Sequence, residues 1–231
     1  MIFDKPVYFG KLIKRYKRFL ADIKLDDGNV ITAHCANSGS MKTCDTAGWR
    51  VLVSDSLNPK RKLRYTFEMI HNEKCWIGIN TQIPNKLAKE AIESGIIKEL
   101  QGYDKILPEQ KYGVNSRIDL LLTNAVEKCF VEVKSVTLVQ DGDYQFPDSV
   151  TARGLKHLNE LLDMKKQGHR AVMLFIIQRS DGNIFKPAKD IDPKYSQRLR
   201  EVYKDGVEVL VYLAKVSPEE IVLSHKIDFV L

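Results

Sequence analysis

The hydrophobic pattern of the chain changes its period at Ile83-Pro84, and this change restricts the folds that are open to it. Before this point, short runs rich in β-branched and aromatic residues alternate with turn signals. After it, the segment NKLAKEAIESG carries apolar residues at helical spacing and ends in Gly95. We therefore expect two domains, residues 1–83 and residues 84–231.

The first segment is predicted to form five short strands and no helix. A turn at Asp26-Asp27-Gly28-Asn29 follows the first run, and the strands are expected at 12–25, 30–36, 49–55, 62–71 and 74–80. Five strands in about 70 residues are typical of a small closed barrel. We expect an OB-like barrel, with an SH3-like barrel as the alternative.

The second segment alternates strands with helices. Strands are expected at 103–111, 116–123, 128–139, 171–179 and 207–216, and helices at 151–168 and 192–206, while a short final segment at 220–229 closes the chain. The run AVMLFIIQR at 171–179 is apolar almost throughout, as in a strand covered on both faces of a sheet. The pattern predicts a mixed α/β domain behind the barrel.

The excess of positive charge lies in the first segment. The chain has 36 basic and 30 acidic side chains, and residues 1–83 hold 14 of the former and 8 of the latter. The cations cluster with aromatic residues in KLIKRYKRF (11–19) and KRKLRY (60–65), a composition that favours phosphate neutralisation and base stacking. The alternative is a pair of strands with solvated basic faces.

Phosphate contacts are expected from five of these cations, Lys14, Arg15, Lys17, Arg18 and Arg64. Because side chains alternate along a strand, only half of the first four can share one face. At least one of them is therefore expected to make no contact with the phosphates.

Nothing in the sequence predicts export or a membrane span. No apolar run approaches the roughly 20 residues of a spanning helix, and the first residues lack the hydrophobic stretch of a signal peptide. We therefore expect a cytoplasmic protein. Its cysteines form no C-x-x-C pair and have no histidine at zinc-finger spacing, so reduced and mostly packed thiols are expected.

Two carboxylates and a lysine form the pattern that most directly predicts chemistry. Glu132 and Lys134 lie two residues apart in FVEVKSVTL and so project from one face of a strand. Asp119 lies in the preceding strand of an expected hairpin and, in register, comes beside Glu132. The two carboxylates would hold Mg²⁺ or Mn²⁺, while Lys134 orients or deprotonates the attacking water. The alternative is an exposed cross-strand ion pair.

This arrangement resembles the D-x(n)-E-x-K signature of the PD-(D/E)xK nuclease superfamily, except that Arg117-Ile118 precedes Asp119 in place of the proline. In such nucleases a glutamate on a helix often completes the site. Glu99, expected near the end of a helix, is the candidate here, and its alternative is a solvated charge. Gln178, at the end of the apolar strand, is a second accessory candidate.

Four segments, in order, resemble the sugar fermentation stimulation protein family: HCANSGSM (34–41), NSRIDLLL (115–122), VEVKSVTL (131–138) and FPDSVTARGLKHLNEL (146–161). The resemblance covers essentially the whole chain. It implies an OB-like N-terminal domain, a nuclease-like C-terminal domain, and DNA binding linked to the expression of sugar-utilisation genes. It places Asp119, Glu132 and Lys134 in the nuclease-like core and supports DNA binding better than cleavage.

Two further groups of residues are candidates for the site. Arg153 and His157 lie four apart on one helix face and could contact a phosphate, although a lone histidine could equally pack on the helix surface. The side chains of a loop at His34, Asn37, Ser38 and Gly39 either hydrogen-bond to the backbone of their own turn or reach across the domain boundary towards the site.

The sequence thus predicts a protein that binds DNA, double-stranded DNA first, with little sequence preference and that carries a Mg²⁺ or Mn²⁺ phosphodiesterase site. No helix-turn-helix or zinc module is visible that would read a base sequence. Three alternatives stay open: a Mg²⁺- or Mn²⁺-dependent DNA nuclease as the main activity, a DNA-binding regulator without catalysis, and an RNA-binding or RNA-processing protein. The sequence also leaves open whether the protein is a monomer or a homodimer.

Overall fold

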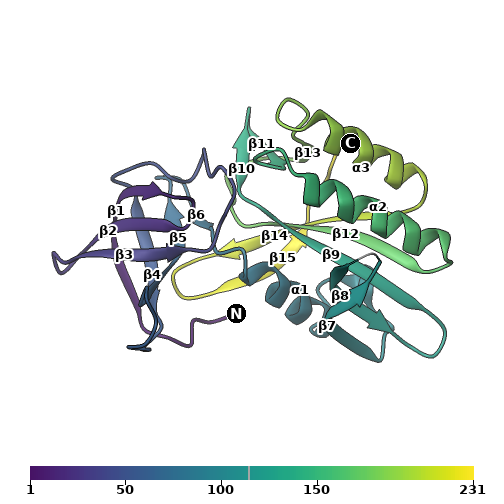
Figure 1. Cartoon of the computed structure of the whole chain (residues 1–231), viewed down its shortest axis with the longest axis horizontal. Coiled ribbons are helices and arrows are strands. Elements are labelled where there is room, and N and C mark those ends of the chain that lie inside the picture. Colours follow the sequence, from purple (N-terminus) through teal and green to yellow (C-terminus); the bar gives the residue numbers. More distant parts are fainter. Residues whose placement is uncertain (114) are drawn as a thin grey trace.

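The computed structural model describes residues 1–113 and 115–231. An N-terminal β-barrel is followed by an α/β domain, and the two lie side by side (Figure 1). This is the predicted fold: a small OB-like barrel and then a PD-(D/E)xK nuclease-like domain. No helix among the described residues is long and apolar enough to cross a membrane.

The barrel closes through a pairing between strands that are not neighbours in the sequence. Its strands are β1 (Val7–Tyr16), β2 (Leu20–Leu25), β3 (Val30–Cys35), β4 (Arg50–Asp55), β5 (Tyr65–His71) and β6 (Trp76–Gly78). The sheet order is β3-β2-β1-β4-β5-β6, and an additional parallel pairing of β3 with β5 closes the barrel. This connectivity is that of an OB fold and decides against the SH3-like alternative.

The first basic cluster forms a hairpin turn. The chain reverses between β1 and β2, where Lys17 and Arg18 adopt positive φ angles of 48° and 63°. The prediction of one continuous strand over 12–25 was wrong, because no Gly, Asn or Asp marks this turn. β5 likewise begins at Tyr65, so the second basic cluster lies largely in the loop before that strand.

The second domain is built on a six-stranded sheet in the order β15-β14-β12-β9-β8-β7. Its strands are β7 (Lys105–Tyr112), β8 (Ser116–Thr123), β9 (Lys128–Val136), β12 (Arg170–Ile177), β14 (Glu208–Val216) and β15 (Ile221–Lys226). β9, β12 and β14 run parallel, while β7, β8 and β15 pair antiparallel with their neighbours. β12 is buried along almost its whole length, as its apolar run predicts.

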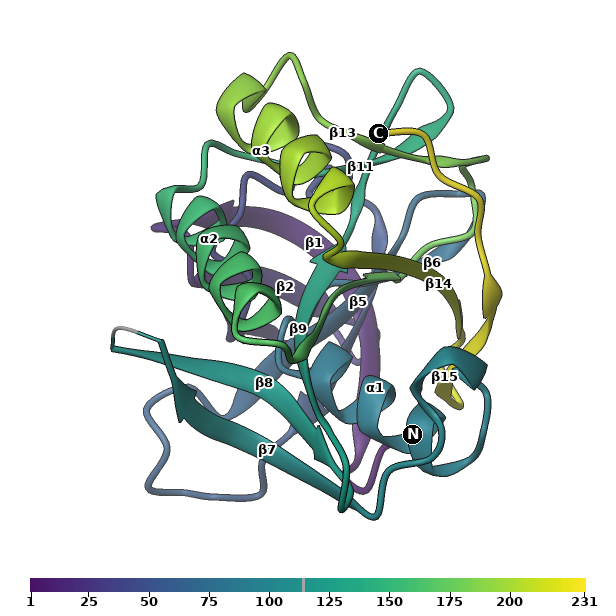
Figure 2. The same cartoon turned by 90° about the vertical axis from the view of Figure 1, so that its right-hand side faces the viewer.

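Helices cover both faces of this sheet. α1 (Ile83–Glu93) packs on one face, and α2 (Ala152–Lys166) and α3 (Pro193–Lys204) pack on the other (Figure 2). A small sheet of β10 (Leu138–Gln140), β11 (Asp143–Phe146) and β13 (Phe185–Pro187) was not predicted, because strands this short carry little periodic signal.

The domain boundary predicted near residue 83 coincides with the first residue of α1. The division of the chain into two domains at this residue stays a prediction. The hydrophobic cluster under α1 also includes Leu52 and Met69 of the barrel, so the core continues from one part into the other. All four cysteines are free thiols, and Cys75 alone among them is incompletely buried, in agreement with the prediction of reduced, packed thiols.

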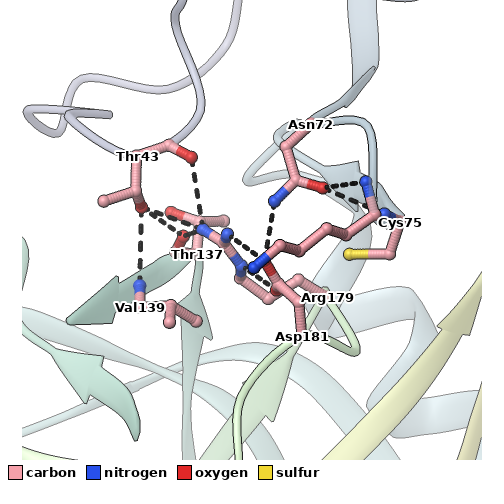
Figure 3. Close-up of polar contacts among 8 residues, drawn as sticks. Thr43, Asn72, Cys75, Thr137, Val139, Arg179 and Asp181 are labelled. Atoms are coloured by element: carbon pink, nitrogen blue, oxygen red, sulfur yellow. Dashed lines mark hydrogen bonds and ion pairs between the residues drawn. The ribbon is translucent and has the colours of Figure 1, made fainter. Parts of the chain in front are cut away.

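Arg179 joins the barrel to the α/β domain through a buried polar cluster (Figure 3). Its guanidinium donates to Thr43 Oγ1 at 2.9 Å, to the Thr137 carbonyl at 2.6 Å, and to both oxygens of Asp181 at 2.7 Å. Asp181 also accepts from Asn72 Nδ2 at 2.6 Å. Because Thr43 and Asn72 belong to the barrel, this cluster, the Arg179 cluster, fixes the two parts relative to each other.

Replacing Arg179 with alanine should lower the free energy of unfolding by about 3–5 kcal/mol, because it removes a buried cation and leaves the carboxylate of Asp181, 10% exposed, without its ion-pair partner. Urea unfolding followed by circular dichroism measures this change. Arg50→Ala is the control, since the Arg50–Asp26 pair is exposed and should contribute less than about 1 kcal/mol. Equal losses in the two variants would contradict the role assigned to the Arg179 cluster.

Candidate active site

A pocket of about 480 Å³ lies where the barrel meets the α/β domain. Barrel residues form part of its lining, and the β8–β9 hairpin, the loop before α2 and the first turns of α2 form much of the rest. The residues that matter for chemistry are Arg18, Asn37, Gly39, Asn85, Asp119, Glu132, Lys134, Ser135, Asp148, Arg153 and His157. The two domains therefore share one cavity.

Asp119 lies on β8 directly beyond the last residue that pairs with β9. The pairing ends at Leu120 and Val131, which brings Asp119 beside Glu132 as the hairpin prediction expected. Its Oδ1 accepts from Asn85 Nδ2 and its Oδ2 accepts from the Val133 amide, each at 2.8 Å. Burial, and then the charge of Glu132, raise the pKa of Asp119 to about 6.

Glu132 is almost completely buried, with 2% of its surface exposed. Its Oε1 accepts from Lys134 Nζ at 2.5 Å and also contacts Nδ1 of His157. Burial acts to raise the pKa of Glu132, but Lys134 and His157 outweigh it and lower the pKa below its usual value. Oε2 is buried and has no hydrogen-bond partner among the described residues. The carboxylate is thus ionised, and its Oε2 is available to a ligand.

His157 is buried beside this carboxylate, and only 4% of it is exposed. The alternative of a histidine on the surface of α2 therefore does not apply. Its Nδ1 lies 3.2 Å from Lys134 Nζ, and its Nε2 accepts from Arg153 Nε at 3.3 Å. This second bond assigns the ring proton to Nδ1, facing Glu132. The signal was present in the sequence, because His157 lies four residues before the buried Leu161 on α2.

Asp119 and Glu132 fit a hard divalent cation. A buried oxygen of Glu132 lacks a partner, and two neighbouring carboxylates are the ligands that Mg²⁺ uses when it keeps several waters. Within residues 1–113 and 115–231, no cluster of three or more His, Cys, Asp or Glu side chains is placed to hold a metal ion. An ion here would therefore depend on these two carboxylates, with water completing its coordination.

The two accessory candidates lie away from the pocket. α1 ends at Glu93, and Glu99 lies in a separate 3₁₀ turn, η1 (Lys98–Leu100), so the expected helix does not carry it to the site. Glu99 instead accepts from Tyr212 Oη at 2.6 Å and from Lys226 Nζ at 2.7 Å. Gln178 is fully buried, is not part of the pocket lining, and donates to the lining residue Ser135 through its Oγ at 2.9 Å.

Of the five cations expected to contact phosphates, Arg18 alone lines the pocket. Arg15 donates to the backbone carbonyls of Arg18, Asn37 and Gly39 at 2.9–3.0 Å, so it holds the pocket wall in place. Arg15 is not part of the pocket lining, and its contact with phosphate stays a prediction.

The other cations of this set lie outside the pocket. Arg64 binds the buried carboxylate of Asp55 through Nε at 2.8 Å and Nη2 at 2.6 Å. The positive charge of Arg64 is therefore already paired with a negative one. Lys14 is exposed and approaches Asp22 to 3.8 Å, and Lys17 is exposed at the hairpin turn. These three residues remain candidates for contacts on the barrel surface.

The loop after β3 forms a hydrogen bond within its own turn and also contacts the α/β domain. Both interpretations of this sequence segment therefore apply. Asn37 Oδ1 accepts from the Gly39 amide at 2.8 Å, and the Met41 amide donates to Asp148 Oδ2 at 3.1 Å. A Cβ atom on Gly39 would clash with the carboxylate of Asp148, so a larger residue there would force this side chain to move. His34 lies in β3 and is not part of the pocket lining.

Two family models match the chain in tandem, "SfsA N-terminal OB domain" over residues 13–79 and "Sugar fermentation stimulation protein RE domain" over residues 82–220. The chain belongs to the sugar fermentation stimulation protein family. A homologue from Geotalea uraniireducens is 54% identical over 223 residues, 96% of each chain, and one from Geobacter sulfurreducens is 53% identical over 227 residues, 98% of this chain and 97% of the other.

A solved structure of this family shares the whole fold. SfsA from Pyrococcus furiosus, in complex with Ca²⁺, superposes with a TM-score of 0.90 at 26% identity, covering 100% of this chain and 98% of that one. Because the match spans both domains at once, the family relative holds its barrel and α/β domain in the same relation. A pocket between the two is thus compatible with the fold of the family.

Gly39→Ala should destabilise the protein by about 1–3 kcal/mol through overpacking against Asp148. In an Asp148→Ala background the same substitution should cost less, because the clashing carboxylate is gone. Thermal unfolding of the four proteins in this double-mutant cycle measures the coupling. Independent, additive effects would show that the loop does not press on Asp148.

Proposed function

We propose that this protein binds DNA with little sequence preference and carries a Mg²⁺- or Mn²⁺-dependent phosphodiesterase site in the shared pocket. The observation that carries the proposal is the unpartnered, buried Oε2 of Glu132 beside Asp119, with Lys134 2.5 Å from the other Glu132 oxygen. A carboxylate pair that is buried and incompletely paired is costly for the fold, and a divalent cation would offset this cost.

The groups that contact the two carboxylates have defined roles in this proposal. Asn85 and the Val133 amide fix the carboxylate of Asp119, and Lys134 and His157 fix that of Glu132. The divalent cation, when bound, polarises a phosphoryl oxygen and lowers the pKa of a bound water. Lys134 is placed to orient the attacking water and to stabilise negative charge on the phosphate.

The positive charge of the protein supports DNA as its ligand. The net charge of the chain is +6, and Arg18 and Arg153 lie in the pocket lining from opposite domains. The N-terminal end of α2 also lies there, with Thr151 capping the helix, and this end of a helix favours an anion. The P. furiosus relative was solved with Ca²⁺, a hard cation that takes the same class of oxygen ligands as Mg²⁺.

A DNA-binding regulator without catalysis is the second candidate. Two observations favour it: Lys134 already compensates the charge of Glu132 while His157 contacts the same oxygen, and the described residues offer no group of three side-chain metal ligands. The name of the relatives refers to stimulation of sugar fermentation, which a DNA-binding protein could exert through gene expression.

Cleavage of plasmid, linear duplex and single-stranded DNA with Mg²⁺ or Mn²⁺ separates the two candidates. Glu132→Gln and Lys134→Ala should each reduce the cleavage rate at least about 100-fold, because both act on the water or the ion. Lys128→Ala is the matched control, since Lys128 is exposed at the other end of β9. Absence of metal-dependent cleavage by the native protein, with DNA binding retained, would establish the regulator instead.

Metal binding should weaken in acid because Asp119 has a pKa of about 6 in the ion-free protein. Above this pH Asp119 is ionised and can bind the ion directly, whereas below it the ion must displace a proton. The apparent affinity for Mn²⁺ should fall by up to about tenfold per pH unit below pH 6. Calorimetric titration in two buffers of different ionisation enthalpy counts the protons released, and an affinity equal at pH 7.5 and pH 5 would contradict this assignment.

A further inference from the structure

A second groove adjoins the carboxylate pocket between α2 and the β7–β8 hairpin. It has a volume of about 390 Å³ and shares Arg153 and His157 with the pocket. Arg117 of β8, Lys156 of α2 and Glu109 of β7 also line it. We call it the α2 groove. With three cations and one acidic side chain in its lining, it favours an anion.

Arg117 lies two residues before Asp119 on β8 and lines the α2 groove, whereas Asp119 lines the carboxylate pocket. Residues i and i+2 of a strand are about 7 Å apart, which is comparable with the separation of neighbouring phosphates along a nucleic-acid strand. A strand with one phosphate at Asp119 and Glu132 could thus present its next phosphate to Arg117.

Arg117 also lies directly opposite another cation. In the β7–β8 register it pairs with Lys111, and both are exposed. Among the described residues, neither side chain makes a hydrogen bond or an ion pair with another. Like charges directly opposite each other on antiparallel strands are unfavourable. An anion bound by Arg117 in the α2 groove would reduce this repulsion.

We infer that the α2 groove binds the phosphate adjacent to the one at the carboxylates, and that Arg117 is the residue that positions it. The inference rests on the proposed function, and it gives the DNA strand a path: from the shared pocket, past Arg153, into the α2 groove. Arg153 is suited to this place because it lines both cavities. Arg117 was noted in the sequence only because the pair Arg117-Ile118 precedes Asp119, where the nuclease signature has a proline.

DNA binding by Arg117 variants tests this inference without cleavage. Fluorescence anisotropy with a labelled single-stranded oligonucleotide in EDTA measures the affinity between 50 and 200 mM salt. For Arg117→Ala, we expect a five- to tenfold weaker affinity and a slope of log K against log salt that is less negative by about 0.7, the loss of one phosphate contact. Arg117→Lys, which keeps the charge, should retain the slope.

Lys105→Ala is the matched control, because Lys105 is an exposed lysine at the opposite end of β7. It should bind DNA like the native protein. Without DNA, Arg117→Ala should unfold at the same urea concentration as the native protein or a higher one, since it relieves the repulsion from Lys111. Where cleavage is measurable, Arg117→Ala should raise KM about five- to tenfold more than it lowers kcat.

The outcomes separate this inference from the proposed function. Native affinity and slope in Arg117→Ala would overturn the role of the α2 groove, while the Glu132 and Lys134 variants would still decide the phosphodiesterase. A native protein whose DNA binding does not weaken with salt would overturn the proposed function and this inference together. Equal losses in Arg117→Ala and Lys105→Ala would show diffuse attraction and also overturn the specific role of Arg117.

Discussion

The buried carboxylate of Glu132 is the constraint around which the α/β domain is arranged. An ionised group with 2% exposure is tolerated only where cations and donors surround it, and here Lys134 and His157 supply them from β9 and α2. Asp119 adds a second negative charge from β8. The hairpin and α2 must therefore pack in one register, because a shift of one residue would turn Glu132 and Lys134 to the opposite face.

The barrel is part of this site. Arg15 holds the loop after β3 from within the barrel, Asp148 binds it from the α/β domain, and the Arg179 cluster prevents the two parts from separating. DNA bound on the barrel and a phosphate at the carboxylates would consequently contact one continuous surface. This accounts for the position of Arg18, which the hairpin turn places in the pocket lining.

The parts of the fold that depend on local periodicity could be predicted from the sequence. Period-two alternation and the turn between β8 and β9 are enough to bring Asp119 beside Glu132. Contacts that depend on tertiary placement could not. The sequence does not reveal that Arg15 donates to the carbonyls of the loop after β3, or that Glu99 lies beyond the end of α1 and contacts Tyr212 and Lys226. The turn at Lys17 and Arg18 has no residue that favours positive φ, so sequence patterns overlook it.

The central claim is that Asp119 and Glu132 together hold a divalent cation. The most direct measurement is the anomalous difference density of a crystal of this protein soaked in Mn²⁺, compared with a crystal of the Glu132→Gln variant treated in the same way. The account predicts one strong peak in the native crystal within coordination distance of oxygens of both Asp119 and Glu132, and a much weaker one in the variant. A native crystal without this peak, or with Mn²⁺ bound only elsewhere, would contradict the account.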